Sequence, residues 1–117
     1  MQTAYQQTPP QMYLGVRANS ALSTYRQEQV ANLSPVEIIN KIFSVAIQAI
    51  KKNDNQLALR AINELIKGLN FEHQEMALSL YRLYQYSKQC LRQGKTGDAI
   101  EVLEELRSAW CEAFKLS

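Results

Sequence analysis

The residues of this sequence that could do chemistry are one histidine, two cysteines and a group of glutamates near the carboxyl end. His73 lies near an expected helix start without a second ligand at the spacing that a zinc site requires. Cys90 and Cys111 both fall inside helical patterns beside apolar residues, where a free thiol behaves as a small buried hydrophobe. Nothing in the sequence pairs either thiol with His73 as nucleophile and base. We therefore expect no metal site and no cofactor.

The glutamates also have an ordinary explanation. A hydrolytic acid pair needs two carboxyls in different environments, but these recur on the polar side of one expected helix: Glu101, Glu104, Glu105 and Glu112. The GKTGD stretch at 94–98 lacks the upstream glycine and the strand of a phosphate-binding loop. The sequence predicts a protein that is not an enzyme.

A helix that would position other side chains begins at Ser34. Ser34, Pro35 and Glu37 have the spacing of a capping box with proline at the first helical position. The helix is apolar on nearly all sides. One face is formed by Ile39, Ile42, Phe43, Ala46, Ala49 and Ile50, and a second apolar row that includes Ile38 and Val45 lies beside it. It is therefore buried on most sides, either by its own domain or by something else.

Three further helical patterns follow, joined by short polar links. Asn53 or Asp54 can cap the second, which ends near Gly68, and the third spans about 72–93. Thr96 or Asp98 can cap the fourth, which ends near 114. On the third helix we expect the core face to be Met76, Leu80, Leu83, Ser87, Cys90 and Leu91. Short links favour an all-α, antiparallel, up-and-down four-helix bundle over residues 25–117, preceded by an N-terminal arm at 1–24. A tetratricopeptide-like array of helix pairs is the rival architecture.

The composition and charge of the chain limit its domain number and its possible partners. The 117 residues are 46% hydrophobic and 21% charged, which suits one globular domain. A net charge of +2 without a basic stripe argues against nucleic acid as a partner. The start of the chain does not look like a secretory signal and no apolar run is long enough to span a membrane, so we expect a cytoplasmic protein without membrane insertion.

Aromatic and apolar residues in excess of a core's needs indicate a protein-binding surface. Tyr81 and Tyr84 are rotated from the Leu80 and Leu83 stripe, so we expect both at a rim where a partner packs.

Five segments of the chain form an ordered series: Tyr25 with Val30, the Ser34–Pro35 pair, KIFSVAI at 41–47, LSLYRLYQY at 78–86 and IEVLEELRSAW at 100–110. In this order they resemble the FliS-type flagellin export chaperones. The chain departs from the family at Phe43, Ser44 and Val45, and at 72–74.

The resemblance implies a chaperone that holds the disordered C-terminal segment of flagellin, prevents premature polymerisation and aids export, with an export-gate component as a further partner. We expect partner contacts from both parts of the chain: Tyr25, Val30, Ile38, Ile42, Phe43, Val45, Tyr81 and Tyr84. Two alternatives stay open. One is a helical adaptor or regulator for another secretion substrate, and the other is a self-associating bundle whose wide apolar stripe forms a homodimer.

Overall fold

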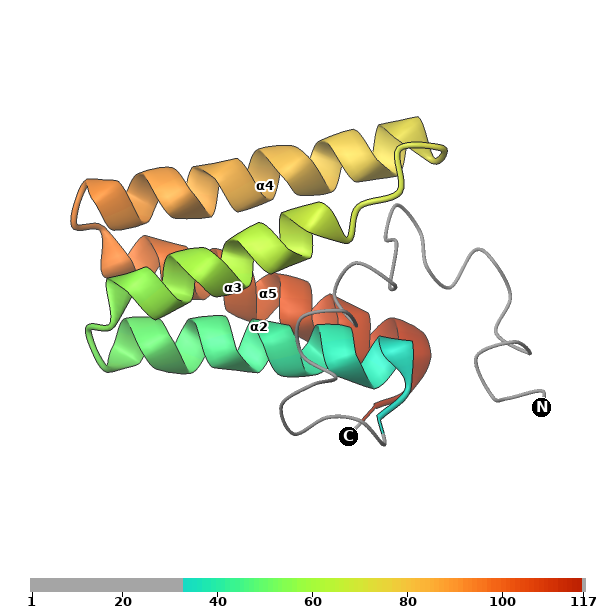
Figure 1. Cartoon of the computed structure of the whole chain (residues 1–117), viewed down its shortest axis with the longest axis horizontal. Coiled ribbons are helices and arrows are strands. Elements are labelled where there is room, and N and C mark those ends of the chain that lie inside the picture. The colour runs from blue at the N-terminus through green and yellow to red at the C-terminus, as the bar shows by residue number, and fades with distance from the viewer. Residues whose placement is uncertain (1–32, 117) are drawn as a thin grey trace.

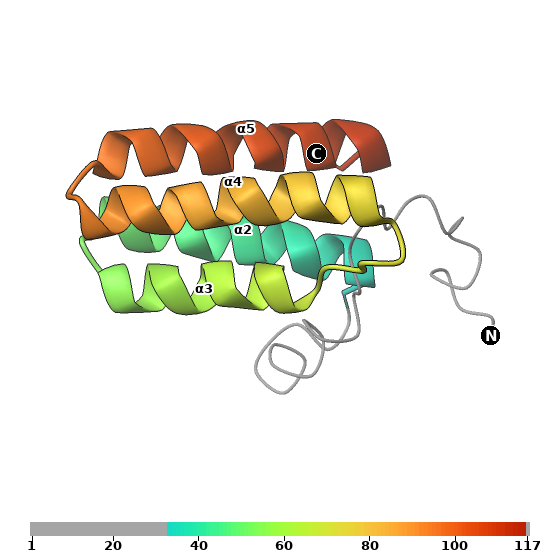
Figure 2. The ribbon, with the colours of Figure 1, turned by 90° about the horizontal axis from the view of Figure 1, so that it is seen from above.

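The computed structural model describes residues 33–116, which form four helices. They are α2 (Pro35–Lys51), α3 (Asn55–Lys67), α4 (Gln74–Arg92) and α5 (Thr96–Phe114). Each helix runs antiparallel to the one before, and α5 returns to the side of α2, so that the bundle closes (Figures 1 and 2). The predicted all-α four-helix bundle is confirmed. The predicted arm at 1–24 lies outside the described residues.

Side-chain caps fix the starts of α2 and α3. Ser34 Oγ accepts a hydrogen bond from the Glu37 N–H at 3.2 Å, and Glu37 Oε1 accepts one from the Ser34 N–H at 2.9 Å. This is the predicted capping box. Asp54 caps α3 as expected, because its Oδ1 accepts the Leu57 N–H at 3.1 Å.

The predicted cap of α5 is wrong. Neither Thr96 nor Asp98 precedes the helix, which begins at Thr96 after Lys95 and has no side-chain cap. Asp98 instead lies in the first turn, where a carboxylate interacts favourably with the positive end of the helix dipole.

The first two residues of the GKTGD stretch, Gly94 and Lys95, form a helix-terminating turn, and the other three begin α5. Gly94 has a φ of +76°, the left-handed conformation that glycine adopts without a steric penalty. The Gly94 N–H donates to the Leu91 carbonyl at 3.2 Å and the Lys95 N–H to the Cys90 carbonyl at 2.8 Å. These two bonds form a Schellman motif, which satisfies carbonyls at the end of α4 and turns the chain into α5.

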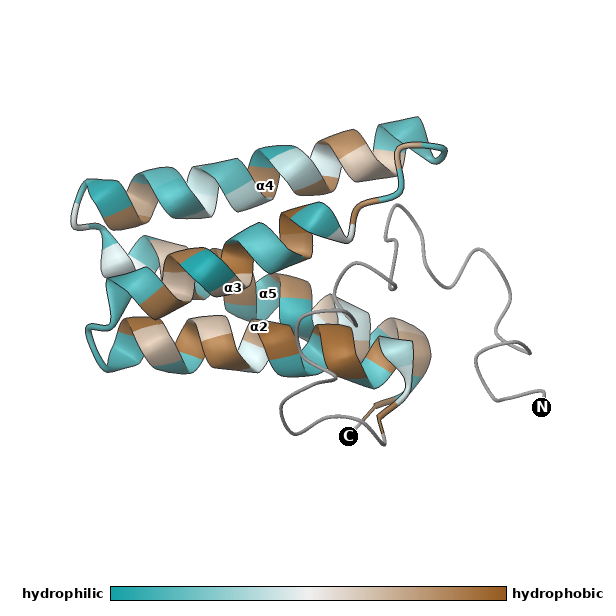
Figure 3. Cartoon of the chain, viewed as in Figure 1, coloured by the Kyte–Doolittle hydropathy of each residue, from teal (hydrophilic) through white to brown (hydrophobic). Residues whose placement is uncertain are grey.

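Helix α2 is the most buried element, as its composition predicted. Its buried residues lie on most sides of the helix: Pro35, Val36, Ile38, Ile39, Ile42, Phe43, Ala46, Ile47, Ala49 and Ile50. Only a polar strip that includes Glu37, Lys41 and Gln48 is exposed. Hydrophobic residues accordingly run along most of α2, whereas hydrophilic residues interrupt them on α4 (Figure 3).

Polar contacts hold α5 against α2. The Trp110 indole N–H donates to the Val36 carbonyl at 2.9 Å. Asn40 Oδ1 accepts from Arg107 Nε at 3.1 Å and from Cys111 Sγ at 3.2 Å. These bonds fix the side of α5 that faces α2. Cys111 is half-buried, whereas Cys90 lies in the core.

The predicted core face of α4 is partly wrong. Ala77, Tyr84 and Leu91, spaced by seven residues, are buried, whereas Met76 and Leu83 are exposed, Leu83 by 39%. Tyr84 is only 2% exposed, and its ring centroid lies 6.3 Å from that of Phe43 on α2. The aromatic ring buries more apolar surface than a leucine, so α4 is rotated to place Tyr84 inside, beside the small Ala77.

Burial of Tyr84 predicts a specific alkaline sensitivity. Removal from water raises the pKa of the Tyr84 phenol above its ordinary value of about 10. The folded state therefore keeps this proton at pH values where the unfolded state has lost it. The stabilising effect is complete below pH about 10 and is lost as the pH rises further. We expect Tyr84→Phe to lose less unfolding free energy than the wild type between pH 9 and 11, roughly the window around a free phenol's pKa. Urea titrations at each pH measure this, with Tyr81→Phe as the control at an exposed position. Equal slopes for Tyr84→Phe and the wild type would contradict the assignment.

Candidate functional site

The residues expected to contact a partner have very different exposures. Ile38, Ile42, Phe43 and Tyr84 belong to the hydrophobic core, and Val45 packs against it half-buried. The expected rim position is therefore wrong for Tyr84, whose ring fills the core. Tyr81 is 36% exposed and does lie at the surface. Tyr25 and Val30 lie outside the described residues, and the contact role of the whole set stays a prediction.

Exposed apolar side chains gather on one element. Among residues 33–116, the large hydrophobic side chains that are exposed lie on α4 or in the link just before it: Phe71, Met76, Leu78, Tyr81, Leu83 and Tyr86. A soluble monomer rarely groups such side chains without a function. The sequence could have revealed this surface, because α4 has more apolar residues than one core face can bury.

The first group, which we call the α3-side patch, consists of Phe71, Leu78 and Tyr81. The rings of Phe71 and Tyr81 meet edge to face with centroids 6.5 Å apart. Lys88, seven residues after Tyr81 and so on the same side of α4, donates from Nζ to Asn63 Oδ1 of α3 at 2.9 Å. The α3-side patch therefore borders the seam between α3 and α4, the least closely packed seam of the bundle.

The second group, which we call the α5-side patch, consists of Met76, Leu83 and Tyr86. Helical spacing of seven and three residues places them on one face, rotated away from Tyr81. Tyr86 is 48% exposed and lies toward the start of α5. The neighbouring Cys90 side chain, and then the negative charges of Asp98 and Glu101, raise the pKa of the Tyr86 phenol. At its Tyr86 end, the α5-side patch therefore lies beside the start of α5.

One buried charge escaped the sequence analysis. Glu64 of α3 is buried, and its Oε2 accepts from Lys67 Nζ at 3.1 Å. Its Oε1 is also buried and has no hydrogen-bond partner among the described residues. Glutamate is almost never buried without pairing, so neither the residue type nor its spacing signalled this position.

Within the described residues, the structure shows where the side chains that could do chemistry lie. His73 is exposed at the start of α4 and makes no capping bond. Within residues 33–116, no three of the His, Cys, Asp and Glu side chains group as metal ligands would. None of the helices that the structure describes is long and apolar enough to cross a membrane.

Comparison with known proteins gives one result. A family model described as "Flagellar protein FliS" matches residues 18–117. Comparisons with curated proteins and with solved structures give no match.

Two alanine variants can test that Tyr84 lies in the core and Tyr81 at the surface of α4. Tyr84→Ala should lower the unfolding free energy by about 3–5 kcal/mol, because it leaves a cavity in the core. Tyr81→Ala should lower it by about 1 kcal/mol or less, because only the exposed contact with the Phe71 ring is lost. Urea unfolding followed by circular dichroism gives both values. Comparable losses in the two variants would mean that α4 is rotated differently.

Proposed function

The chain belongs to the FliS family of flagellar export chaperones, and we propose that it binds the C-terminal segment of flagellin in the cytoplasm and delivers it for export. On this proposal the segment is disordered when free and folds into helices on the chaperone. Its apolar side chains, which bury one another in the filament, are covered, so the subunit stays monomeric until secretion.

The observation that carries this proposal is the exposed apolar surface of α4. A disordered client can wrap a large surface, and part of the contact energy is spent on ordering it. Such a client needs apolar side chains spread along an element rather than one deep pocket, as helix-in-groove recognition requires. The α3-side patch offers such side chains beside the seam between α3 and α4, and its Tyr81 is one of the residue types enriched at interaction hot spots.

The buried row of α2 has a different place in the proposal. Ile38 and Ile42 are fully buried, so a client can reach them only if the residues that cover them move. We therefore assign first contact to the α3-side patch.

Binding of the client can be measured directly. The probe is a peptide of about forty residues from the C-terminus of a flagellin, which spans roughly 60 Å when helical. Calorimetric titration should give saturable one-to-one binding, with a gain of helix by circular dichroism. Tyr81→Ala should weaken binding by about tenfold or more, as loss of a hot-spot aromatic does.

The matched control is Lys52→Ser, an exposed change in the link between α2 and α3, which should leave the affinity unchanged. Binding that is equally strong in Tyr81→Ala would remove the α3-side patch from the proposal. No binding by the wild type would favour an adaptor for another secretion substrate or a self-associating bundle.

The N-terminal arm at 1–24 gives a second test. Its sequence includes Met12, Tyr13, Leu14 and Val16, so we propose that it competes with the client for the same apolar surface. Deleting residues 1–24 should then tighten binding of the flagellin peptide, because the competing segment is gone. Unchanged affinity in the calorimetric titration would show that the arm does not compete.

A further inference from the structure

The flank of α4 that faces α3 changes in character along its length. Residues spaced by three, four or seven follow this flank from the preceding link to the end of the helix, and we call them the α4 strip: Phe71, Leu78, Tyr81, Gln85, Lys88 and Arg92. The first three are the apolar side chains of the α3-side patch. The last three are polar, and two of them are cations. The α4 strip is therefore apolar at its start and basic at its end.

The start of the α4 strip lies beside exposed carboxylates. Glu72 is in the link before α4, and Glu75 is in the first turn of the helix. Lys67, at the end of α3, does not neutralise them by an ion pair, because its Nζ is paired with Glu64 at 3.1 Å. This end of the α4 strip therefore carries negative charge.

The other end of the α4 strip carries positive charge. Lys88 donates from Nζ to Asn63 Oδ1 at 2.9 Å, which holds its ammonium at the seam with α3. Arg92 lies one turn further along α4, and exposed Arg60 lies one turn before Asn63 on α3. Exposed Lys95 follows directly after α4. Within residues 33–116, none of these four cations is in an ion pair.

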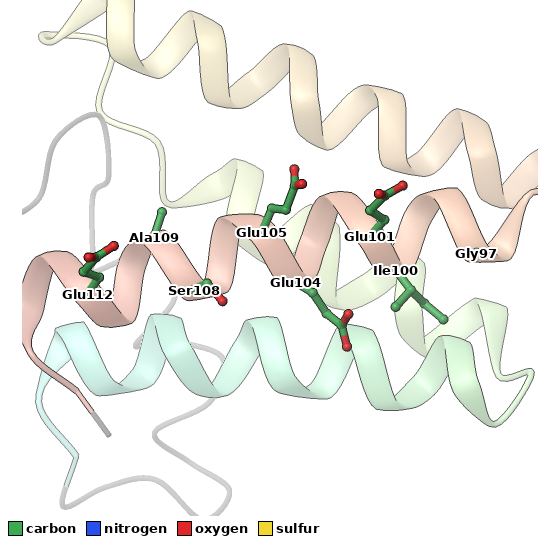
Figure 4. Close-up of a pocket in the computed structure, with 8 residues that line it drawn as sticks. All are labelled: Gly97, Ile100, Glu101, Glu104, Glu105, Ser108, Ala109 and Glu112. Atoms are coloured by element: carbon green, nitrogen blue, oxygen red, sulfur yellow. The ribbon is translucent and has the colours of Figure 1, made fainter.

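The remaining carboxylates near this end of the bundle have other positions. Four glutamates line a shallow hollow of about 500 Å³ on the surface of α5 itself (Figure 4). Asp98 and Glu101 act on the phenol of Tyr86, which lies on the opposite flank of α4. Asp54 accepts the Leu57 N–H at the start of α3. The α4 strip therefore runs from a negative end to a positive end.

Such a strip is complementary to a second copy of itself. When two copies face each other about a two-fold axis, their α4 helices are antiparallel, and the start of each strip meets the end of the other. Glu72 and Glu75 of each copy then approach Lys88 and Arg92 of the other, and this pairing occurs twice. The apolar side chains around Tyr81 are removed from water in the middle of the interface.

Other occupants match the α4 strip less well. A nucleic acid or an anionic membrane would be attracted by the basic end, but Glu72 and Glu75 would repel it. A disordered segment must be ordered when it binds, and this ordering takes part of the contact energy. A second copy presents the complementary charges on a helix that is already folded, so its association has no such cost.

We propose that two copies of this chain associate through the α4 strip, with their α4 helices antiparallel, when no client is bound. The pairing of residues 72–75 with 88–92 has its midpoint between Leu80 and Tyr84, so Tyr81 and Arg82 lie closest to the two-fold axis. Helix α4 has 19 residues and is about 28 Å long. A pair of helices of this length makes a small interface, so the dimer forms reversibly.

The dimer also affects the client. Because the α3-side patch lies inside this interface, the second copy and the flagellin segment compete for it. This consequence rests on the proposed function, whereas the dimer itself does not require flagellin.

An exchange of charges between the two ends tests the antiparallel pairing. One variant carries Lys88→Glu with Arg92→Glu, and the other carries Glu72→Lys with Glu75→Lys. Each variant alone should dimerise about tenfold or more weakly than the wild type, because like charges meet at both ends. An equimolar mixture should form a heterodimer about as stable as the wild-type dimer, because opposite charges meet again. Sedimentation velocity of the full chain over a range of concentrations at physiological salt measures each equilibrium.

Further variants separate the interface from general charge effects. Lys41→Glu with Lys52→Glu makes the same change in net charge as Lys88→Glu with Arg92→Glu, at exposed positions outside the α4 strip, and should leave the dimer unchanged. Arg82→Gln should strengthen the dimer, because it removes like charges near the two-fold axis. Tyr81→Ala should weaken it by about tenfold. Circular dichroism confirms that each variant is folded.

Three results would overturn the proposal. The first is a wild-type chain that stays monomeric at every concentration. The second is a mixture that associates no better than either charge variant alone. The third is an equal loss in Lys41→Glu with Lys52→Glu and in Lys88→Glu with Arg92→Glu, which would reduce the effect to net charge.

The flagellin peptide tests the competition. Its addition should convert the dimer into one-to-one complexes, and a dimer that persists with the peptide bound would show that the two ligands use different surfaces. Because the charge exchange needs no flagellin, failure of the dimer is distinct from failure of the proposed chaperone function.

Discussion

The packing of Tyr84 against Phe43 is the contact on which the surface of this bundle depends. Tyr84 faces inward together with Ala77 and Leu91, and this row sets the rotation of α4 about its axis. Once that rotation is set, Met76, Leu83 and Tyr86 must lie on one flank, and Leu78 and Tyr81 on the other. A single core contact thus determines which apolar side chains stay in water.

Helices α2 and α4 therefore have different roles in the bundle. Helix α2 has most of its surface buried and is tied to α5 by Asn40 and Trp110, so it serves as the scaffold. Helix α4 buries one narrow row and presents apolar side chains on both flanks. A chaperone needs this combination, because a surface that attracts apolar segments must be carried by a core that does not open. Membership of the FliS family agrees with such a division.

Much of the fold could be predicted from local chemistry. The starts of α2 and α3 were predictable from Ser34 with Glu37 and from Asp54, because a helix cap involves only neighbouring residues. The near-complete burial of α2 followed from its composition, and the family was identifiable from short segments such as LSLYRLYQY. The rotation of α4 was missed because Leu80, Leu83 and Tyr84 fit two overlapping helical stripes. Only the shape of the partner helices decides between them, and Phe43 is distant in sequence. The burial of Glu64 also required the three-dimensional arrangement.

The junction of α2 and α3 bears on how the chain folds. Asn53 adopts a left-handed φ of 62°, and the Asp54 N–H donates to the Ala49 carbonyl at 2.8 Å while its side chain caps the next helix. One residue therefore closes α2 and opens α3, and the largest helix-to-helix contact of the bundle joins two helices that are consecutive in sequence. Local contacts incur little loop-closure entropy and form quickly. We therefore expect the α2–α3 hairpin to form early in folding, before α4 and α5 dock onto it.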